Sequence, residues 1–190
     1  MVAQALPSFG IRTVETVLRD HHIYLYEFSE DMTDLLFLIN SAVAGCDTLH
    51  FHMNNCGGDM HSGAQILHAI EEAMDCDIHV ICYIEAICES MGAVFVARLI
   101  TLGATVHIGK VQYLMFHNVS ISQGSSTCTN VIRDAEETRK LYLHMLENYC
   151  RPLITDDEIA RVIKGEEIYI SCDVLIARIK SIIPEGETVH

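Results

Sequence analysis

Basic side chains are scarce in this chain, which has 12 Lys and Arg against 26 Asp and Glu in 190 residues. The formal net charge of −14 argues against nucleic acid as a partner, because phosphate binding needs clustered Lys and Arg. No apolar run reaches the roughly 18 residues that a membrane-spanning helix needs, so we expect no membrane partner. We also find no N-terminal stretch with the charged start and apolar run of a signal peptide.

The eight cysteines contain no C-x-x-C pair. Without a secretion signal they indicate reduced thiols and a cytoplasmic protein. His50, His52, Cys56 and His61 are potential metal ligands, and the two histidines at 50 and 52 share one face of a strand. No pair has zinc-finger spacing and no H-E-x-x-H motif occurs, so a metal site is the minor alternative and we expect no cofactor.

Strand-like and helix-like runs alternate between three prolines and eleven glycines, which predicts a single domain with an α/β layered fold. Ser29 and Ser171 are expected to cap helices. A hydrophobic content of 50% indicates subunit interfaces or a sheet covered on both faces. Strands are expected at 23–28, 48–53, 78–84, 105–108 and 113–116, and helices at 31–43, 61–75, 91–102, 131–149 and 171–179.

The stretch from Cys88 to Ala93 is the most informative in the chain, because it joins an apolar strand to a helix that is apolar on every side. Such a helix is buried, and Ser90 stands at its N-terminus among unpaired backbone N–H groups. Carbonyl chemistry would find both a nucleophile and an oxyanion site there. The simpler interpretation is that Ser90 only caps the helix, and the segment alone favours the cap.

The turn from Asn55 to Asp59 joins a strand to a helix and contains two glycines, which let the backbone approach a ligand closely. It lacks the Lys-Ser/Thr of a P-loop and the third glycine of a dinucleotide fingerprint. It is either a plain strand-to-helix turn or part of an oxyanion site. In the second case a backbone N–H of the turn and the backbone N–H of Met91 would both donate to the oxyanion.

His117 ends the apolar run 113–116, at the end of an expected strand. Functional groups gather at strand ends in α/β folds, so His117 is either a general base near Ser90 or a core histidine. A catalytic histidine needs an acid to orient it. Glu166 and Glu167 precede the apolar run 168–170 and are candidates for that acid, although most glutamates are solvated.

The glycine turn, the Ser90 segment, His117 and the glutamates before 168–170 follow one another along the chain. In this order they resemble the motifs of the proteolytic subunit of the Clp protease, a family with the ClpP/crotonase fold. The resemblance implies a repeated β-β-α spiral fold, with an N-terminal segment at 1–22, a protease domain at 23–183 and a C-terminal tail at 184–190. It also implies a protruding handle hairpin and helix at 118–150. The matching motifs are Asn55-Cys-Gly-Gly58, Glu89-Ser-Met-Gly-Ala93, Met115-Phe-His-Asn118 and Tyr169-Ile-Ser171.

The resemblance implies a serine endopeptidase that needs neither a cofactor nor a metal. Ser90 is then the nucleophile, His117 its base and Glu167 the acid, with the backbone N–H groups of Gly58 and Met91 as oxyanion donors. Unfolded polypeptides or peptides would be the substrates, each lying extended between the glycine turn and the hairpin. The family also implies homo-oligomeric rings, heptameric and stacked in pairs, and an AAA+ unfoldase as a possible partner.

Several residues depart from the family pattern. Glu167 stands where the family has aspartate, and Glu89 replaces a small residue beside the nucleophile. The strand before Ser90 is about two residues longer, and Cys56 replaces the proline of the turn. A catalytically impaired or regulatory ring subunit is therefore an alternative. A crotonase-like acyl-thioester enzyme, which would not need Ser90 and His117 together, is less favoured.

Overall fold

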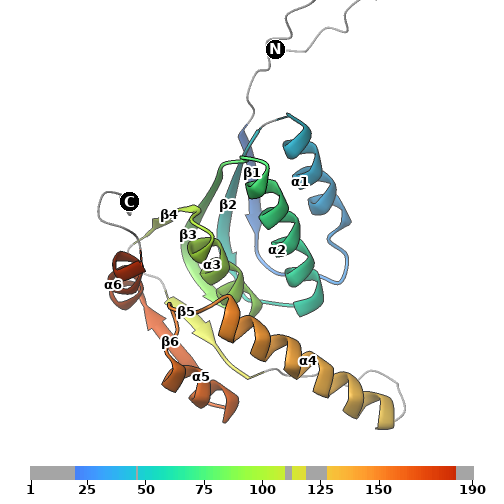
Figure 1. Ribbon diagram of the computed structural model, residues 1–190, viewed down its shortest axis with the longest axis vertical. Coiled ribbons are helices and arrows are strands. Elements are labelled where there is room, and N and C mark those ends of the chain that lie inside the picture. Colours follow the sequence, from blue (N-terminus) through green and yellow to red (C-terminus); the bar gives the residue numbers. More distant parts are fainter. Residues whose placement is uncertain (1–19, 46, 110–112, 119–127, 183–190) are drawn as a thin grey trace, which may run out of the picture.

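The computed structural model describes residues 20–45, 47–109, 113–118 and 128–182 (Figure 1). Over these ranges the chain forms an α/β fold with a mixed six-stranded sheet and six helices. The hairpin expected at 119–129 falls mostly on 119–127, outside the described residues. The strands are β1 (Asp20–Leu25), β2 (Thr48–Asn55), β3 (Val80–Glu89), β4 (Thr105–Ile108), β5 (Tyr113–Phe116) and β6 (Ile168–Ser171). The helices are α1 (Thr33–Gly45), α2 (Met60–Asp75), α3 (Met91–Thr101), α4 (Cys128–Asn148), α5 (Asp156–Ile163) and α6 (Cys172–Ile182).

The sheet is ordered β1-β2-β3-β5-β6, with β4 paired to β3 outside this path. All pairings are parallel except the antiparallel pair β5 and β6. Along one edge β3 pairs with two strands: its first half pairs with β4 and its second half with β5. The carboxyl ends of β2, β3 and β5 consequently lie at one edge of the sheet, where an α/β fold places its functional groups.

β3 is longer than the sequence predicted, because it continues past position 84 to Glu89. Its pairing with β2 shifts register along the way: Met53 pairs with Ile84, whereas Asn55 pairs with Cys88. Two residues of β2 therefore span four of β3, and the irregularity absorbs the two additional residues. This shift keeps the end of β3 level with the turn that follows β2.

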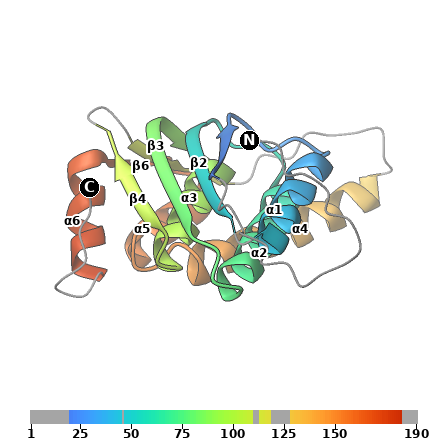
Figure 2. The ribbon, with the colours of Figure 1, turned by 90° about the horizontal axis from the view of Figure 1, so that it is seen from above.

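The core forms between the sheet and the helices that lie across it (Figure 1). Alternate residues of β2 point into this core, and Leu49, Phe51 and Met53 are fully buried. α3 is buried along nearly its whole length, as its uniform apolar sequence predicted. In Figure 2, β2, β3 and β4 lie side by side with α3 behind them, and α6 lies beyond β4 at the edge of the molecule.

Ser29 does not cap α1, contrary to the prediction. The helix begins only at Thr33, and the Ser29 hydroxyl donates to the backbone carbonyl of Asp31, at 2.8 Å. The preceding residue Phe28 forms a parallel bridge with Gly58, which keeps this part of the chain extended. None of the helices in the described ranges combines the length and the apolar character that a membrane crossing requires.

Two short elements were not predicted, α5 and β6. α5 begins with a capping box in which the Thr155 side chain accepts from Glu158 N and the Glu158 side chain accepts from Thr155 N. β6 pairs with β5, so that Tyr169 lies opposite Met115 and Ser171 opposite Tyr113. Ser171 is thus the last residue of a strand, immediately before α6.

Candidate active site

Ser90 has a backbone conformation that few residues other than glycine adopt, with φ 54° and ψ −123°. Among the described non-glycine residues only Asp77 also has a positive φ. Such a conformation costs energy and persists only where the surroundings impose it, as at the sharp strand-to-helix turns that carry nucleophiles. The Ser90 side chain makes no capping hydrogen bond, although the residue stands at the N-cap of α3. The helix-cap interpretation is therefore wrong.

The glycine turn makes room for this conformation. Gly57 and Gly58 have φ values of +100° and +118°, which only glycine adopts without strain. A Cβ at Gly57 would meet the Ser90 side chain, and one at Gly58 would collide with the Phe28 carbonyl oxygen. The turn is therefore pressed between Ser90 on one side and the segment that follows β1 on the other.

Asn55 fixes the turn from inside the core. The residue is fully buried. Its side-chain Nδ2 donates to the Leu25 carbonyl at 3.2 Å, and its Oδ1 accepts from Gly57 N at 2.8 Å. The same Oδ1 lies 2.5 Å from where a Cβ on Gly92 would be. Asn55 thus holds β1, the turn and the first turn of α3 in one arrangement.

The backbone N–H groups of Gly58 and Met91 lie beside Ser90 and have no acceptor in the described part of the chain. Met91 is the first residue of α3, where an N–H has no partner within the helix. Gly58 N is free because the bridge to Phe28 uses Gly57 O and Asp59 N. Free N–H groups of this kind stabilise a negatively charged oxygen.

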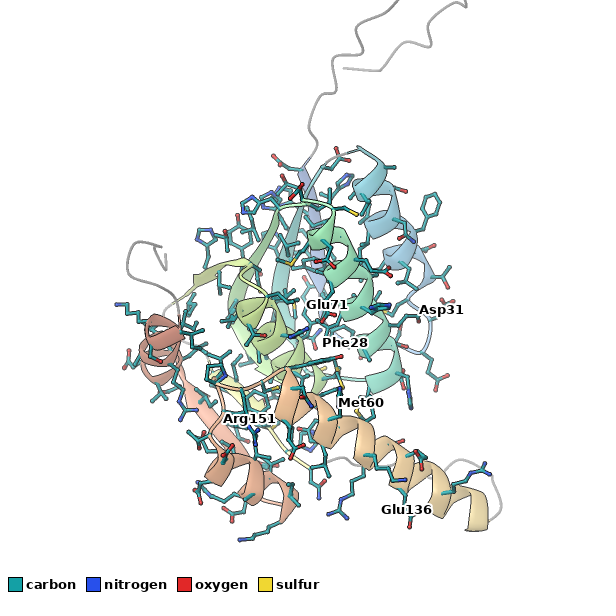
Figure 3. The ribbon with its side chains drawn as sticks, in the orientation of Figure 1. Phe28, Asp31, Met60, Glu71, Glu136 and Arg151 are labelled. Atoms are coloured by element: carbon teal, nitrogen blue, oxygen red, sulfur yellow. The ribbon has the colours of Figure 1, made fainter. Side chains whose placement is uncertain are left out.

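A cavity of about 470 Å³ opens at Ser90. It brings together four of the residues that the sequence singled out: Ser90, His117, Gly58 and Met91. Its other walls come from the segment after β1, the start of α2 and the middle of α4. Met60, the first residue of α2, is labelled in Figure 3 and lines the cavity. The remaining lining residues are Glu27, Phe28, Ser29, Glu30, Asp59, Met60, His61, Thr138 and Tyr142.

His117 follows β5 directly and is half-buried. No hydrogen bond joins its ring to Ser90 or to a carboxylate among the described residues. Catalytic hydrogen bonds are often long in the absence of substrate and tighten when it binds. The structure therefore brings Ser90 and His117 to one cavity and leaves them unbonded.

Both candidate acids bind other partners and neither lines the cavity. Glu167 is exposed and accepts a hydrogen bond from the Tyr169 hydroxyl at 2.9 Å. Glu166 pairs with Arg161, whose Nε lies 2.8 Å from the carboxylate. The assignment of the acid to Glu167 stays a prediction.

Glu89 turns away from the cavity, although it precedes the nucleophile in sequence. Its carboxylate accepts a hydrogen bond of 2.6 Å from the Tyr113 hydroxyl, which raises the pKa of Tyr113 to about 12. The ring of Tyr113 contacts Tyr169 edge to face, with centroids 5.3 Å apart. Glu89 and Glu167 are thus held by two tyrosines that pack against each other.

The possible metal ligands do not converge. His61 lines the cavity, whereas His52 lies on the sheet face, with Nδ1 at 2.7 Å from Glu85. His50 is next to His52 on that face and contacts the ring of Tyr83. Within the described ranges no group of three or more His, Cys, Asp or Glu residues is arranged to hold a metal ion.

Sequence reasoning missed three contributors to the cavity: Glu27, Glu30 and Tyr142. The first two follow β1, far from Ser90 in sequence, and only the bridge between Phe28 and Gly58 brings them to the site. Tyr142 was expected simply as an apolar residue of a long helix. Periodicity gives no sign that its hydroxyl would be buried beside a cavity.

A scan of the chain against protein-family models gives no match, and the curated proteins contain no match either. What the structure defines is an α/β protein with a mixed sheet. At one end of that sheet, a strained serine, a histidine and two free N–H groups share a cavity.

Proposed function

We propose that the protein is a serine endopeptidase of the Clp type that hydrolyses peptide bonds of unfolded proteins or peptides. The observation that carries this proposal is Ser90, which is held at a positive φ with an uncapped hydroxyl in the cavity that His117 also lines. A serine that only caps a helix would need neither a positive φ nor a histidine in the same cavity. The free N–H groups of Gly58 and Met91 add the third requirement of acyl transfer, a site for the oxyanion.

In the proposed reaction the Ser90 Oγ attacks the carbonyl carbon of the peptide while His117 accepts the hydroxyl proton. The N–H groups of Gly58 and Met91 stabilise the negative oxygen of the tetrahedral intermediate. When the C–N bond breaks, His117 donates the proton to the leaving amine. Water then attacks the acyl-serine, with His117 again accepting and returning a proton, which releases the acid and regenerates Ser90.

Glu167 is proposed to orient the His117 ring in this reaction. Glu167 would have to leave the Tyr169 hydroxyl, which it contacts in the structure. It immediately precedes β6, the strand that pairs with β5, and His117 directly follows β5. The proposal therefore requires the Glu167 carboxylate to rotate away from Tyr169 and toward the end of β5, where His117 lies.

The assembly is also part of the proposal and follows from the resemblance. Homo-oligomeric rings, heptameric and stacked in pairs, would enclose the cavity in a chamber in the cytoplasm, and an AAA+ unfoldase would supply unfolded chains. A spiral fold of β-β-α repeats and a handle at 118–150 belong to the same proposal. The outward course of α4, which extends beyond the rest of the molecule in Figure 1, supports a handle.

The contacts of the two acids favour one alternative, a catalytically impaired or regulatory ring subunit. Glu166 and Glu167 are each bound to another side chain, and among the described residues no carboxylate is hydrogen-bonded to the His117 ring. Such a subunit would keep the fold and the cavity without turnover. A crotonase-like acyl-thioester enzyme would use only the two N–H groups and would keep its activity without Ser90.

Reaction with a fluorophosphonate tests the proposal, because the reagent forms an O–P bond with an activated serine and releases fluoride. We expect the protein to be labelled at Ser90, and Ser90→Ala to abolish labelling. His117→Ala should slow labelling by roughly 100-fold or more, the usual contribution of a general base. Ser41→Ala is the matched control, since its hydroxyl is exposed on α1 and bonds to Phe37 O. An unlabelled parent protein, or labelling that survives in Ser90→Ala, contradicts the proposal.

A further inference from the structure

The segment after β1 is fixed against the glycine turn by two short backbone hydrogen bonds. Phe28 N donates to Gly57 O and Phe28 O accepts from Asp59 N, both at 2.7 Å. The Phe28 side chain is buried and contacts Phe95. In extended chain the neighbouring side chains point the opposite way, so burial of Phe28 leaves Glu27 and Ser29 on the solvent side, where both line the cavity.

The described wall of the cavity carries negative charge. Glu27, Glu30 and Asp59 line it, and none of its described residues is a lysine or arginine. No described residue forms an ion pair with Glu27 or Glu30, and both are exposed. Asp59 accepts the N–H of Ser62 at 2.8 Å and so caps α2. The other titratable wall residues are His61, His117 and Tyr142.

Tyr142 supplies a second, independent feature of the same wall. The residue is 4% exposed, and its hydroxyl is buried without a hydrogen-bond partner among the described residues. Burial raises the pKa of the Tyr142 hydroxyl. The backbone of His117 is close to this hydroxyl and opposes part of the rise in pKa, but the two groups do not have the geometry of a hydrogen bond. A buried hydroxyl without a partner is costly, and a ligand with N–H groups that enters the cavity would relieve that cost.

We propose that this cavity selects substrates with a lysine or arginine immediately before the scissile bond, an inference that rests on the proposed function. The side chain of the attacked residue is the one nearest to Ser90, where the cavity opens. Its methylene groups would lie along Met60, which is partly buried and lines the cavity. Its ammonium or guanidinium group would reach Glu27 and Glu30, and would donate a hydrogen bond to the Tyr142 hydroxyl.

The selectivity should be moderate and sensitive to salt. Glu27 and Glu30 are exposed, and each exposed ion pair contributes only a factor of a few. We therefore expect a roughly tenfold preference for lysine over norleucine, its uncharged counterpart of similar shape, at low ionic strength. Raising the salt to about 1 M should remove most of it, because charges in water are screened within a few ångströms there.

Three peptide diphenyl phosphonates that differ only in the residue next to phosphorus provide the test: lysine, norleucine and glutamate. Each labels a nucleophilic serine by forming an O–P bond to Ser90 and releasing phenol, so no turnover is needed. We expect the rate of labelling to fall in the order lysine, norleucine, glutamate. The double variant Glu27→Gln/Glu30→Gln should lose the preference, so that the lysine and norleucine reagents label at similar rates.

Two further variants separate recognition from a general effect on the fold. Glu72→Gln removes one negative charge from an exposed site on α2, twelve residues beyond Met60, and should retain the preference. Tyr142→Phe should lower the ratio of the lysine rate to the norleucine rate. A merely structural role of Tyr142 would lower both rates together.

The outcomes distinguish the two proposals. If the fluorophosphonate and all three peptide reagents leave Ser90 unlabelled, the proposed function fails and this inference falls with it. If the fluorophosphonate labels Ser90 but the norleucine reagent matches or exceeds the lysine reagent, the inference alone is overturned. A lysine preference that persists in Glu27→Gln/Glu30→Gln also overturns it, because the charge would then be recognised elsewhere.

Discussion

Gly57 and Ser90 approach so closely that a Cβ on Gly57 would lie 2.6 Å from the Cβ of Ser90. The two residues come from different strand-to-helix connections, β2 to α2 and β3 to α3. Each has a positive φ, and Ser90 has it without the freedom of glycine. Close packing against the glycine turn is therefore part of what holds the Ser90 side chain in the cavity.

Gly57→Ala should destabilise the fold and abolish labelling of Ser90. The new methyl group would face the Ser90 side chain and also lie 3.0 Å from the Glu89 carbonyl oxygen, while φ remains at +100°. We expect a loss of about 3 kcal/mol or more in the free energy of unfolding, from left-handed strain and overpacking together. Urea unfolding and the rate of fluorophosphonate labelling measure the two effects.

Gly103→Ala is the matched control for that change. Gly103 has a similar φ of +85°, but nothing lies within 4 Å of the position of its Cβ. Only the strain remains, which costs roughly 1–2 kcal/mol, and labelling should be unchanged. Equal losses of stability in the two variants would show that contact with Ser90 has no part in the effect.

Asn55→Ala should weaken the protein more than an average buried substitution and should also slow labelling. The change leaves the Gly57 N–H without its acceptor and removes the donor to the Leu25 carbonyl. Unmatched buried polar groups cost about 1–3 kcal/mol each, so a loss of about 3 kcal/mol is expected in urea unfolding. Ser62→Ala, at another buried polar residue in the first turn of α2, keeps Asn55 and should label normally.

The grouping of Ser90, His117, Gly58 and Met91 was expected from the resemblance, because the local patterns alone also fitted a helix cap, a core histidine and a plain turn. The structure brings the four residues to one cavity, since the parallel strands β2, β3 and β5 end at one edge of the sheet. The conformation of Ser90 was not predictable in the same way. The segment alone favoured a cap, and the positive φ arises from the turn packed against it.

The residues that were missed depend on long-range contacts. Glu27 and Glu30 reach the cavity through a bridge between Phe28 and Gly58, thirty positions apart. β3 was predicted too short because the register shift at Met53 and Asn55 has no signature in β3 itself. α5 left a signal that was overlooked, because Thr155 and Glu158 have the spacing of a capping box.

The acid of the proposed triad can be assigned by comparing three variants. Glu167→Gln should slow labelling of Ser90 by roughly 100-fold or more if its carboxylate orients His117, whereas Glu166→Gln should have little effect. Tyr169→Phe removes the hydroxyl that holds Glu167 and keeps the ring against Tyr113. We expect this variant to label faster than the parent. Slower labelling in Tyr169→Phe, or a larger effect of Glu166→Gln, contradicts the assignment.

Glu158 should make the stability of the protein depend on pH in the acid range. Its carboxylate joins α5 to α6 through two contacts of 2.8 Å with the Arg178 guanidinium, and it accepts from Thr155 N. Burial raises the pKa of Glu158, but the hydrogen bonds from Arg178 and Thr155 outweigh burial and bring the pKa below its ordinary value of 4.5. The ionised form is therefore bound more strongly in the folded protein.

A lowered pKa adds stability above the unfolded pKa and loses it as the pH falls through the folded pKa. Glu158→Gln should therefore cost about 2 kcal/mol at pH 7, the scale of a charged hydrogen bond and part of a cap. The difference from the parent should shrink below about pH 4.5 and disappear once Glu158 is protonated in both states. Urea unfolding between pH 3 and pH 7 measures it. Glu147→Gln, at an exposed position on α4, should track the parent throughout, and a constant deficit in Glu158→Gln would contradict the role of the carboxylate charge.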